Sequence, residues 1–266
     1  MKIFDCITFY DENLLANARF EILDGVVDYH VICESRFDHS GNKKRLNFKL
    51  KNYKFKNKII YLVINQPFES PQNQWNNEDQ QRNHLFKGIE KANPDDLILF
   101  SDSDEIPNPK KLINFNLKKK FAIFFQNFYT YKINIFNKFE TPWEGTRATK
   151  RKNLKNFNYL RKKVSSKNIK KNFLKFYIEK DIEIIKDGGW HFNNLYTLEK
   201  ISQKIKVSPH QEFNKPKYYK IENIRKRIDN LEDLYDRGYC YKKLKLDDSF
   251  PEYILKNSKL FKDYII

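Results

Sequence analysis

Short apolar runs, separated by longer stretches in which polar residues predominate, recur through the first hundred residues. These runs are Lys2–Phe9, Val26–Cys33, Lys58–Ile64 and Leu97–Phe100. They are brief and mostly rich in Ile, Val and Phe, as buried strands require. We therefore predict four strands whose two faces are both covered.

Helical spacing lies between these strands. A capping signal at residues 11–13 precedes a helix through Ile22, and a second helix carries Glu78, Asp79 and Arg82 in its first turns before Asn93-Pro94 ends it. Strands that alternate with helices indicate an α/β fold with a mostly parallel sheet flanked by helices.

The pattern changes in the second half of the chain. Residues Phe121–Phe128 and Tyr129–Phe136 predict two long strands with no helix between them, which adds antiparallel strands to the same sheet. C-terminal helices are predicted at Thr197–Ile205, Tyr218–Tyr235 and Tyr253–Ile266. Because no linker rich in Pro, Gly or Ser interrupts the chain, we predict a single domain over residues 1–266.

Composition narrows the class of protein. Aromatic residues make up 16% of the 266 residues, enough for a substantial core, and the longest apolar run, Ile59–Ile64, is far shorter than the roughly 20 residues of a membrane span. Cys6, Cys33 and Cys240 are odd in number and lack CxxC spacing, so we expect neither a disulfide framework nor a zinc ribbon.

The net charge of +17 suggests a polyanionic partner. Two tracts free of acidic residues, 41–58 and 145–178, hold 20 Lys and Arg residues, so the rest of the chain has a net charge of about −3. Solvated surface, an anionic membrane or acceptor, and nucleic acid all stay open as explanations, with nucleic acid the least favoured. We predict that the tract at about 145–178 is a loop-rich insertion or flap.

Carboxylates cluster at Asp102-Ser103-Asp104-Glu105, directly after an apolar strand. Ligands of open α/β sheets bind at the carboxyl ends of strands, and paired carboxylates suit a hard divalent cation that bridges phosphate oxygens. The alternative is an Asp-rich helix N-cap, since Asp104 to Pro107 also resembles a helix start.

Two further motifs are candidates for chemistry. Asp187-Gly188-Gly189-Trp190-His191 offers a glycine turn that permits close backbone approach and an imidazole for a metal, or else a tight turn with a core Trp. His210-Gln211-Glu212 offers a ligand or acid/base pair, or else a loop with a solvated Glu. The seven glycines form neither a GxGxxG motif nor a Walker A loop, and neither GxSxG nor HExxH occurs.

Read in order, several segments resemble glycosyltransferase family 17. They are Val26-Val27-Asp28 with Val31 to Ser35, Trp75 to Arg82, Pro94-Asp95-Asp96 with Asp102 to Pro107, Gly189-Trp190-His191, and Pro251 to Asn257. Their shared order and spacing covers nearly the whole chain except the basic tract around 150–175.

The resemblance implies a GT-A-like domain and a transferase of the β-1,4-N-acetylglucosaminyltransferase type. Its donor would be a nucleotide sugar, UDP-GlcNAc or a related UDP-sugar, bound with Mn²⁺ or Mg²⁺ in a donor half at 1–118, with an acceptor-side half at 119–266. It implies Asp102, Asp104 and His191 as metal ligands, with Arg82, Glu34 and Trp190 completing the donor pocket. Arg82 and Glu34 are equally compatible with a surface salt bridge and a capped strand end.

An inverting mechanism would need a carboxylate base, for which Glu212 and Glu105 rank ahead of Glu144 and Asp79. The acceptor would be a glycan or glycolipid. Because the chain begins without the membrane anchor and stem of the eukaryotic family member, we expect a cytoplasmic enzyme of surface polysaccharide or lipopolysaccharide synthesis, in peripheral contact with the anionic inner membrane. The alternatives are a nucleic-acid- or polyanion-binding protein and a sugar-binding relative without activity.

Overall fold

The computed structural model describes residues 1–70, 72–170, 178–207 and 211–266. The chain divides into two compact units. Unit 1 comprises Met1–Gln126 and Glu144–Gly189, and unit 2 comprises Asn127–Trp143 and Trp190–Ile266. These bounds differ from the predicted halves 1–118 and 119–266, because residues 144–189 return to the first unit.

Unit 1 is built on a parallel sheet with the strand order β3–β2–β1–β4. Its strands are β1 (Ile3–Phe9), β2 (Tyr29–Ser35), β3 (Ile59–Ile64) and β4 (Leu97–Ser101). All four predicted strands are confirmed, although β2 begins at Tyr29 rather than Val26. Because parallel strands end at the same edge of a sheet, the residues that follow β1, β2 and β4 gather there.

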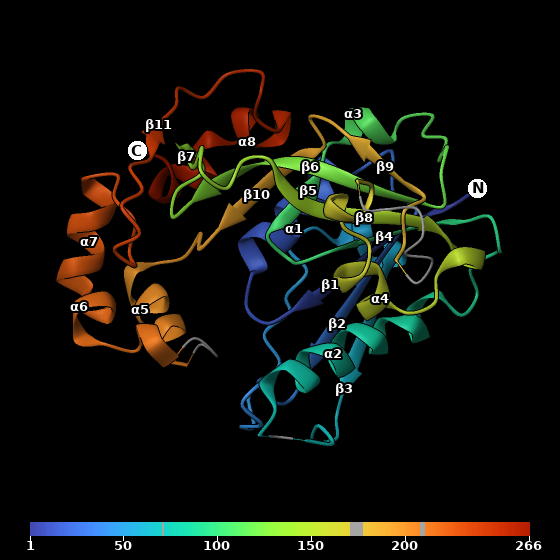
Figure 1. The fold of residues 1–266 in the computed structure, drawn as a ribbon, viewed down its shortest axis with the longest axis horizontal. Coiled ribbons are helices and arrows are strands. Elements are labelled where there is room, and N and C mark those ends of the chain that lie inside the picture. The colour runs from blue at the N-terminus through green and yellow to red at the C-terminus, as the bar shows by residue number, and fades with distance from the viewer. Residues whose placement is uncertain (71, 171–177, 208–210) are drawn as a thin grey trace. The chain divides into compact units, whose positions relative to one another are not determined.

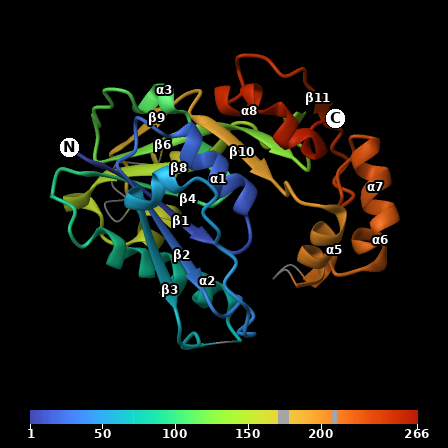
Figure 2. The ribbon, with the colours of Figure 1, turned by 180° about the vertical axis from the view of Figure 1, so that it is seen from behind.

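Helices cover both faces of this sheet. Ile7 and Phe9 of β1 pack with helix α1 (Asn13–Ile22) and the 3-10 turn η1 (Tyr53–Lys58). The alternate residues Phe4 and Cys6 pack in a cluster with residues of η2 (Leu85–Ile89) and α4 (Phe157–Lys162). Helix α2 (Gln74–His84) lies on the same side as α4 in Figure 1, and Figure 2 shows α1 on the opposite side.

Antiparallel pairing extends the sheet beyond β4, as predicted, but the strand next to β4 comes from residues 143–150 and not from the strands predicted at 121–136. Strand β8 (Trp143–Lys150) pairs with β4, with Leu97 opposite Lys150. Strand β6 (Phe121–Thr130) is next in the strand order, and its first residues pair in parallel with β9 (Ile182–Ile185). The predicted α/β class, a mostly parallel mixed sheet flanked by helices, is confirmed.

The basic tract differs from the loop-rich insertion that we predicted. Over residues 145–170 it contains most of β8, the turns η3 (Arg151–Asn153) and η4 (Ser166–Asn168), and α4. Phe157, Leu160 and Val164 are fully buried in the core of unit 1. The periodic apolar residues of this segment outweigh its charge, because the Lys side chains between them point to solvent. Residues 171–177 lie outside the described part of the chain.

Unit 2 carries shorter strands. The end of β6, from Asn127 to Thr130, pairs in parallel with β10 (Gly189–Asn193), and Tyr129 pairs antiparallel with β7 (Ile135–Phe136), which pairs with β11 (Lys242–Lys243). The first predicted long strand is confirmed as β6. The second was wrong, because Tyr131 adopts a positive φ of 63° and turns the chain out of β6, and the short β7 follows.

The helices of unit 2 are α5 (Leu198–Val207), α6 (Pro216–Tyr219), α7 (Ile221–Asp229) and α8 (Glu252–Lys256), with the 3-10 turns η5 (Gln211–Phe213) and η6 (Ser258–Tyr264). The helix predicted at Thr197–Ile205 is confirmed as α5. The prediction at Tyr218–Tyr235 is too long, because Lys220 is extended between α6 and α7 and Leu231 has a positive φ of 59°. The single helix predicted at Tyr253–Ile266 is replaced by the short helix α8 and the 3-10 turn η6.

The structure also bears on membrane-spanning helices and on the state of the cysteines. Among the described residues, no helix is both long and apolar enough to cross a membrane. All three cysteines are free thiols: Cys6 and Cys33 are buried in β1 and β2, and Cys240 is exposed in unit 2. Burial raises the pKa of the Cys33 thiol to about 12 and that of Cys6 well above its usual value.

Candidate functional site

The carboxylate cluster follows β4 at the carboxyl edge of the unit 1 sheet. Asp102 to Asp104 form a turn in which the Glu105 N–H donates to the Asp102 carbonyl at 3.0 Å, and Glu105–Pro107 then forms the short strand β5. The alternative reading of Asp104-Glu105 as a helix start is wrong, because Asn108 instead caps the following helix α3 (Pro109–Leu112).

A buried arginine fixes this turn from below. The Arg19 guanidinium, fully buried on α1, donates to both Asp5 carboxylate oxygens at 2.5 and 2.6 Å and to the Glu105 carbonyl at 2.5 Å. It also reaches the Ser101 hydroxyl at 2.9 Å. Asp5 in turn accepts from His30 Nδ1 at 2.9 Å. The turn after β4 therefore rests on an ordered, buried ion-pair network.

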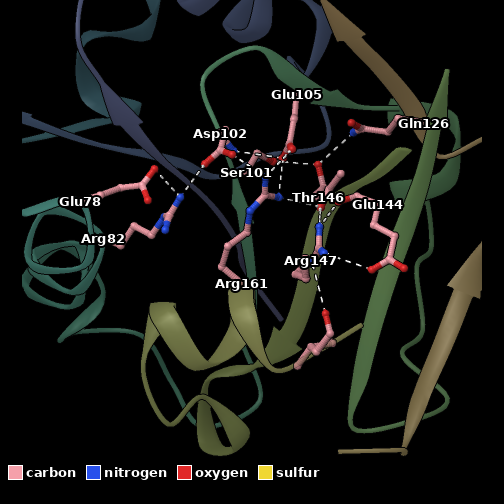
Figure 3. A network of polar contacts seen from close by, with 12 residues as sticks. Glu78, Arg82, Ser101, Asp102, Glu105, Gln126, Glu144, Thr146, Arg147 and Arg161 are labelled. Carbon is pink, nitrogen blue, oxygen red and sulfur yellow. Dashed lines mark hydrogen bonds and ion pairs between the residues drawn. The ribbon is translucent and has the colours of Figure 1, made fainter. Parts of the chain in front are cut away.

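Arg161, from α4 in the basic tract, points its guanidinium toward the same turn (Figure 3). Its guanidinium is 2.5 Å from Asp102 Oδ2 and 2.9 and 3.2 Å from the two oxygens of Glu105, which is itself fully buried. Burial acts to lower the pKa of Arg161, but the charges of Asp102 and Glu105 outweigh it and hold the pKa above its usual value. Arg161 therefore holds both carboxylates in position through charge-assisted hydrogen bonds.

A second arginine, Arg147 of β8, stands beside this ion pair. It donates to the carbonyls of Glu144 and Gly145 and pairs with the Glu144 carboxylate at 3.3 Å. Burial, and next the charge of Arg161, lower the pKa of Arg147 to about 10. The Glu144 carboxylate also accepts from the Ser166 hydroxyl at 2.5 Å, so Glu144 is held within this framework.

Helix α2 presents a polar face to the interior of unit 1. Its buried side chains are Asn77, Gln81 and Arg82. Gln81 Nε2 donates to the carbonyls of Phe9 and Cys33, 3.2 and 2.8 Å away, near the ends of β1 and β2. Arg82 pairs with Glu78 at 2.7 Å and lies 3.7 Å from Asp102 Oδ1. The predicted site residue Arg82 is thereby brought to the carboxylate cluster.

Asp102 and Asp104 are the members of this cluster that solvent reaches. The Asp102 side chain is 31% exposed, Asp104 is partly exposed, and Glu105 is fully buried. Cations such as Mg²⁺ are commonly held by one or two carboxylates together with water and substrate phosphates, and this pair fits that donor set. Within the described ranges no group of three or more His, Cys, Asp or Glu side chains could hold a metal ion.

Glu34, predicted for the donor pocket, has a framework position. It is fully buried, and its carboxylate accepts from Lys44 Nζ at 2.7 Å, from Tyr61 at 2.7 Å and from the backbone N–H groups of Asn47 and Phe48. These bonds attach the first basic tract to the end of β2. Its assignment to donor binding stays a prediction.

The glycine motif divides between the two units. Gly189 has a φ of 134°, as the alternative of a turn predicts, and a Cβ there would lie 2.1 Å from the Ile106 carbonyl oxygen of β5. Close approach of this backbone to a ligand stays a prediction. Trp190 belongs to unit 2, where its indole donates to the Ser249 carbonyl at 2.8 Å. His191, also in unit 2, packs between Phe128 and Trp143 with ring centroids at 4.4 and 4.9 Å. Trp190 as a donor-pocket residue and His191 as a metal ligand both stay predictions.

The remaining candidate bases differ in their surroundings. Asp79 pairs with Lys162 at 2.5 Å, whereas Glu212 is exposed in η5 of unit 2. The companion residue His210 lies outside the described part of the chain. Glu105, Glu144 and Asp79 thus all lie in ion pairs of unit 1.

Sequence reasoning missed Arg161, Arg147 and Arg19 as parts of the site. Arg19 follows Ala16 and Ala18 in an otherwise apolar helix face, and this isolated charge at a core position is the signal that would have found it. Arg161 has no such signal, because four lysines between 155 and 167 share its charge and its contact with Asp102 is what separates it from them.

Comparisons with known proteins agree with the resemblance seen in the sequence. Residues 1–262 match the profile of glycosyltransferase family 17. The chain is 31% identical over 116 residues to the β-1,4-mannosyl-glycoprotein 4-β-N-acetylglucosaminyltransferases of Rattus norvegicus and Homo sapiens. Each match covers 40% of this chain and 22% of the relative's length. The predicted class of enzyme, a glycosyltransferase, is confirmed at the level of the family.

Solved structures with a similar arrangement are more remote. The 2-C-methyl-D-erythritol 4-phosphate cytidylyltransferase of Francisella tularensis is 11% identical with a TM-score of 0.37, and the match covers 70% of this chain and 90% of that one. HddC of Yersinia pseudotuberculosis is 10% identical with a TM-score of 0.34, covering 74% and 92%.

Proposed function

Since this chain belongs to glycosyltransferase family 17, we propose that it is a metal-dependent, inverting glycosyltransferase that moves N-acetylglucosamine from UDP-GlcNAc to a hydroxyl of a glycan or glycolipid. The observation that carries this proposal is the partly exposed pair Asp102 and Asp104 at the carboxyl end of β4, with two arginines beside Asp102. Its relatives that transfer N-acetylglucosamine support the choice of sugar.

Asp102 and Asp104 would hold the Mn²⁺ or Mg²⁺ that accompanies the donor. A divalent cation there supplies neutralisation of the charge that develops on the diphosphate leaving group. Arg161 and Arg82 hold the Asp102 carboxylate in one orientation, and they leave its partly exposed edge for the ligand. These two arginines are positioning residues in this scheme.

The acceptor hydroxyl must lose its proton as its oxygen attacks the anomeric carbon from the face opposite the leaving diphosphate. Both oxygens of Glu105 accept hydrogen bonds from Arg161, so we assign Glu105 to positioning the turn. Glu212, which the sequence ranks beside Glu105, is then our proposed base. A carboxylate base contributes about 10²- to 10⁴-fold to the rate.

The biological setting belongs to the same proposal. We place the enzyme in the cytoplasm, in surface polysaccharide or lipopolysaccharide synthesis, with peripheral contact to the anionic inner membrane. Exposed lysines along both basic tracts, among them Lys49, Lys51, Lys163 and Lys167, support that contact.

One experiment with two variants tests the assignment. Asp104→Asn should lose the Mn²⁺-dependent part of UDP binding measured by calorimetry, because one anionic oxygen donor is removed. Glu212→Gln should bind UDP with unchanged affinity and lose about 100-fold or more in kcat, because the amide cannot accept the proton. Transfer by Asp104→Asn within tenfold of the parent, with Mn²⁺ present, contradicts the metal site. An unchanged kcat in Glu212→Gln removes it as the base.

A further inference from the structure

Unit 2 contains a cavity of about 480 Å³ whose lining residues all belong to that unit. Its floor comes from β6 and β10, one wall from α5 and η5, and another from the loop 233–241. This volume lies within the range of about 300–1,000 Å³ that small-ligand sites occupy. Nothing in the proposed donor site uses this cavity.

The lining combines flat aromatic surfaces with planar polar groups. Trp143, Phe213 and Tyr235 line it and are only partly buried. Tyr235 packs on Phe213 with ring centroids 4.2 Å apart, which makes one continuous aromatic wall. The amides of Asn193 and Asn194 lie along the same cavity. Aromatic faces suit the C–H face of a pyranose ring, and amides suit its vicinal hydroxyls.

A buried carboxylate preorganises the loop that forms one wall. Asp233, 2% exposed, accepts from the backbone N–H groups of Tyr235 and Arg237 at 2.8 and 3.0 Å. It also accepts from the Arg237 guanidinium at 2.6 Å and from the Tyr241 hydroxyl at 2.9 Å. Groups that are already held in place cost less ordering entropy when a ligand binds.

The charges at the cavity offset one another. Arg237 lies 2.6 Å from Asp233 and 3.5 Å from Glu140, and Lys204 is the other cation that lines the cavity. Among the described residues two cations, Arg237 and Lys204, and one carboxylate, Glu140, line the cavity, and the buried Asp233 behind Arg237 brings the local sum of charges to zero. A diphosphate therefore gains little here, and a neutral ligand is favoured.

We propose that this cavity is a binding site for a neutral saccharide, the acceptor of the reaction. That the bound saccharide is the acceptor rests on the proposed function, whereas saccharide binding itself is inferred from the cavity alone. Trp143, Phe213 and Tyr235 stack on sugar rings, and Asn193 and Asn194 bind their hydroxyls.

Calorimetry and saturation-transfer NMR on the full chain test this site with chitobiose, mannotriose and N-acetyllactosamine as probes, with and without UDP. At least one probe should bind, and saturating UDP with Mn²⁺ should not displace it. Tyr235→Ala should weaken that binding about tenfold or more. Tyr53→Ala, which removes an aromatic ring 76% exposed on unit 1, is the matched control and should leave it unchanged.

Asn194→Gly serves as a second variant that is expected to fold. Asn194 has a positive φ of 53°, so glycine relaxes the backbone while it removes the amide. This variant should also lower the affinity for the saccharide probe. Absence of binding by all three probes at about 20 mM, or both variants within threefold of the parent, overturns the proposal. UDP binding in the same samples reports on the donor site separately, so failure of one site is distinguished from failure of the other.

Discussion

Single residues decide the properties of the candidate site, and most of the deciding residues are arginines. Arg19, Arg147 and Arg161 are buried or nearly so, and each is held by carboxylates or carbonyls of unit 1. Burying a charge is tolerated only when it is paired and hydrogen-bonded. Removal of one partner of such an ion pair therefore costs more free energy of unfolding than the intact pair contributes on balance, because the other charge stays buried.

Arg161→Ala should lower the free energy of unfolding by about 3–5 kcal/mol, because it removes the cation that pairs with Asp102 and with the buried Glu105. The neighbouring Lys162→Ala is the matched control. Its ammonium, 42% exposed, pairs with the 29% exposed Asp79, so it should cost less than about 1 kcal/mol. Urea unfolding measures both variants. Equal losses would show that Arg161 acts as an ordinary surface charge.

The Asp5–His30–Arg19 network predicts a pH dependence. Burial holds the pKa of His30 below its usual 6.5 despite the bond to Asp5. Burial also opposes ionisation of Asp5, but Arg19 and next His30 outweigh it and hold the pKa of Asp5 below 3.8. In both cases the unfolded chain binds protons that the folded chain does not.

Stability should therefore be fully present above about pH 6.5, fall as pH decreases because of His30, and fall further below about pH 3.8 because of Asp5. Urea unfolding at pH 7.5, 6.0 and 5.0 measures the first step. In His30→Gln the slope over that interval should be reduced. The same slope in the variant would assign the pH dependence to other groups.

At the scale of elements, the strands were predictable and the site helix was only partly so. β1, β3 and β4 could be read from apolar runs because both faces of this sheet are covered. The position of α2 was also predicted, but its buried face carries Asn77, Gln81 and Arg82. Hydrophobic periodicity assigns such positions to solvent. The contacts of Gln81 with the ends of β1 and β2 thus required the structure.

The junction of β5 with the start of β10 gives a prediction about glycine. Gly189→Ala should destabilise the protein by about 2 kcal/mol more than Gly25→Ala, in urea unfolding. Both residues have positive φ angles, 134° and 84°, so both variants strain the backbone. Only at Gly189 does the new Cβ meet an atom, the Ile106 carbonyl oxygen at 2.1 Å, while Gly25 has open space. Equal costs would mean that β5 can move away.

For the whole molecule, the α/β class and the family could be read from the sequence, whereas the role of the charge could not. The net charge of +17 is concentrated in two tracts, and the structure divides each tract into structural and exposed charges. Lys44 binds Glu34 and Arg161 binds Asp102, while Lys163 and Lys167 are exposed. Net charge is a sum over the chain and carries no information on which side chains find partners.

The exposed charges predict binding to anionic vesicles. Replacing Lys163, Lys167 and Lys170 by Gln should weaken binding to vesicles with phosphatidylserine by about tenfold or more at low salt, since each nearby cation adds about 1 kcal/mol. Arg161 must stay, because its loss would disturb Asp102 and Glu105. Sedimentation with vesicles measures the bound fraction of each protein. Increasing salt should also reduce vesicle binding by the parent protein, because salt screens the charges. Unchanged sedimentation of the triple variant would make these lysines ordinary solvated surface.

The burial of two thiols and the exposure of the third allow selective labelling of the protein at Cys240. A maleimide reacts with thiolates, and burial with the raised pKa values of Cys6 and Cys33 keeps those two unreactive in the folded state. Cys240 is exposed and is followed by Tyr241, which lines the unit 2 cavity. An environment-sensitive fluorophore attached to the unmutated chain would therefore be one residue away in sequence from the cavity lining, where a change of its emission on adding a saccharide would report binding.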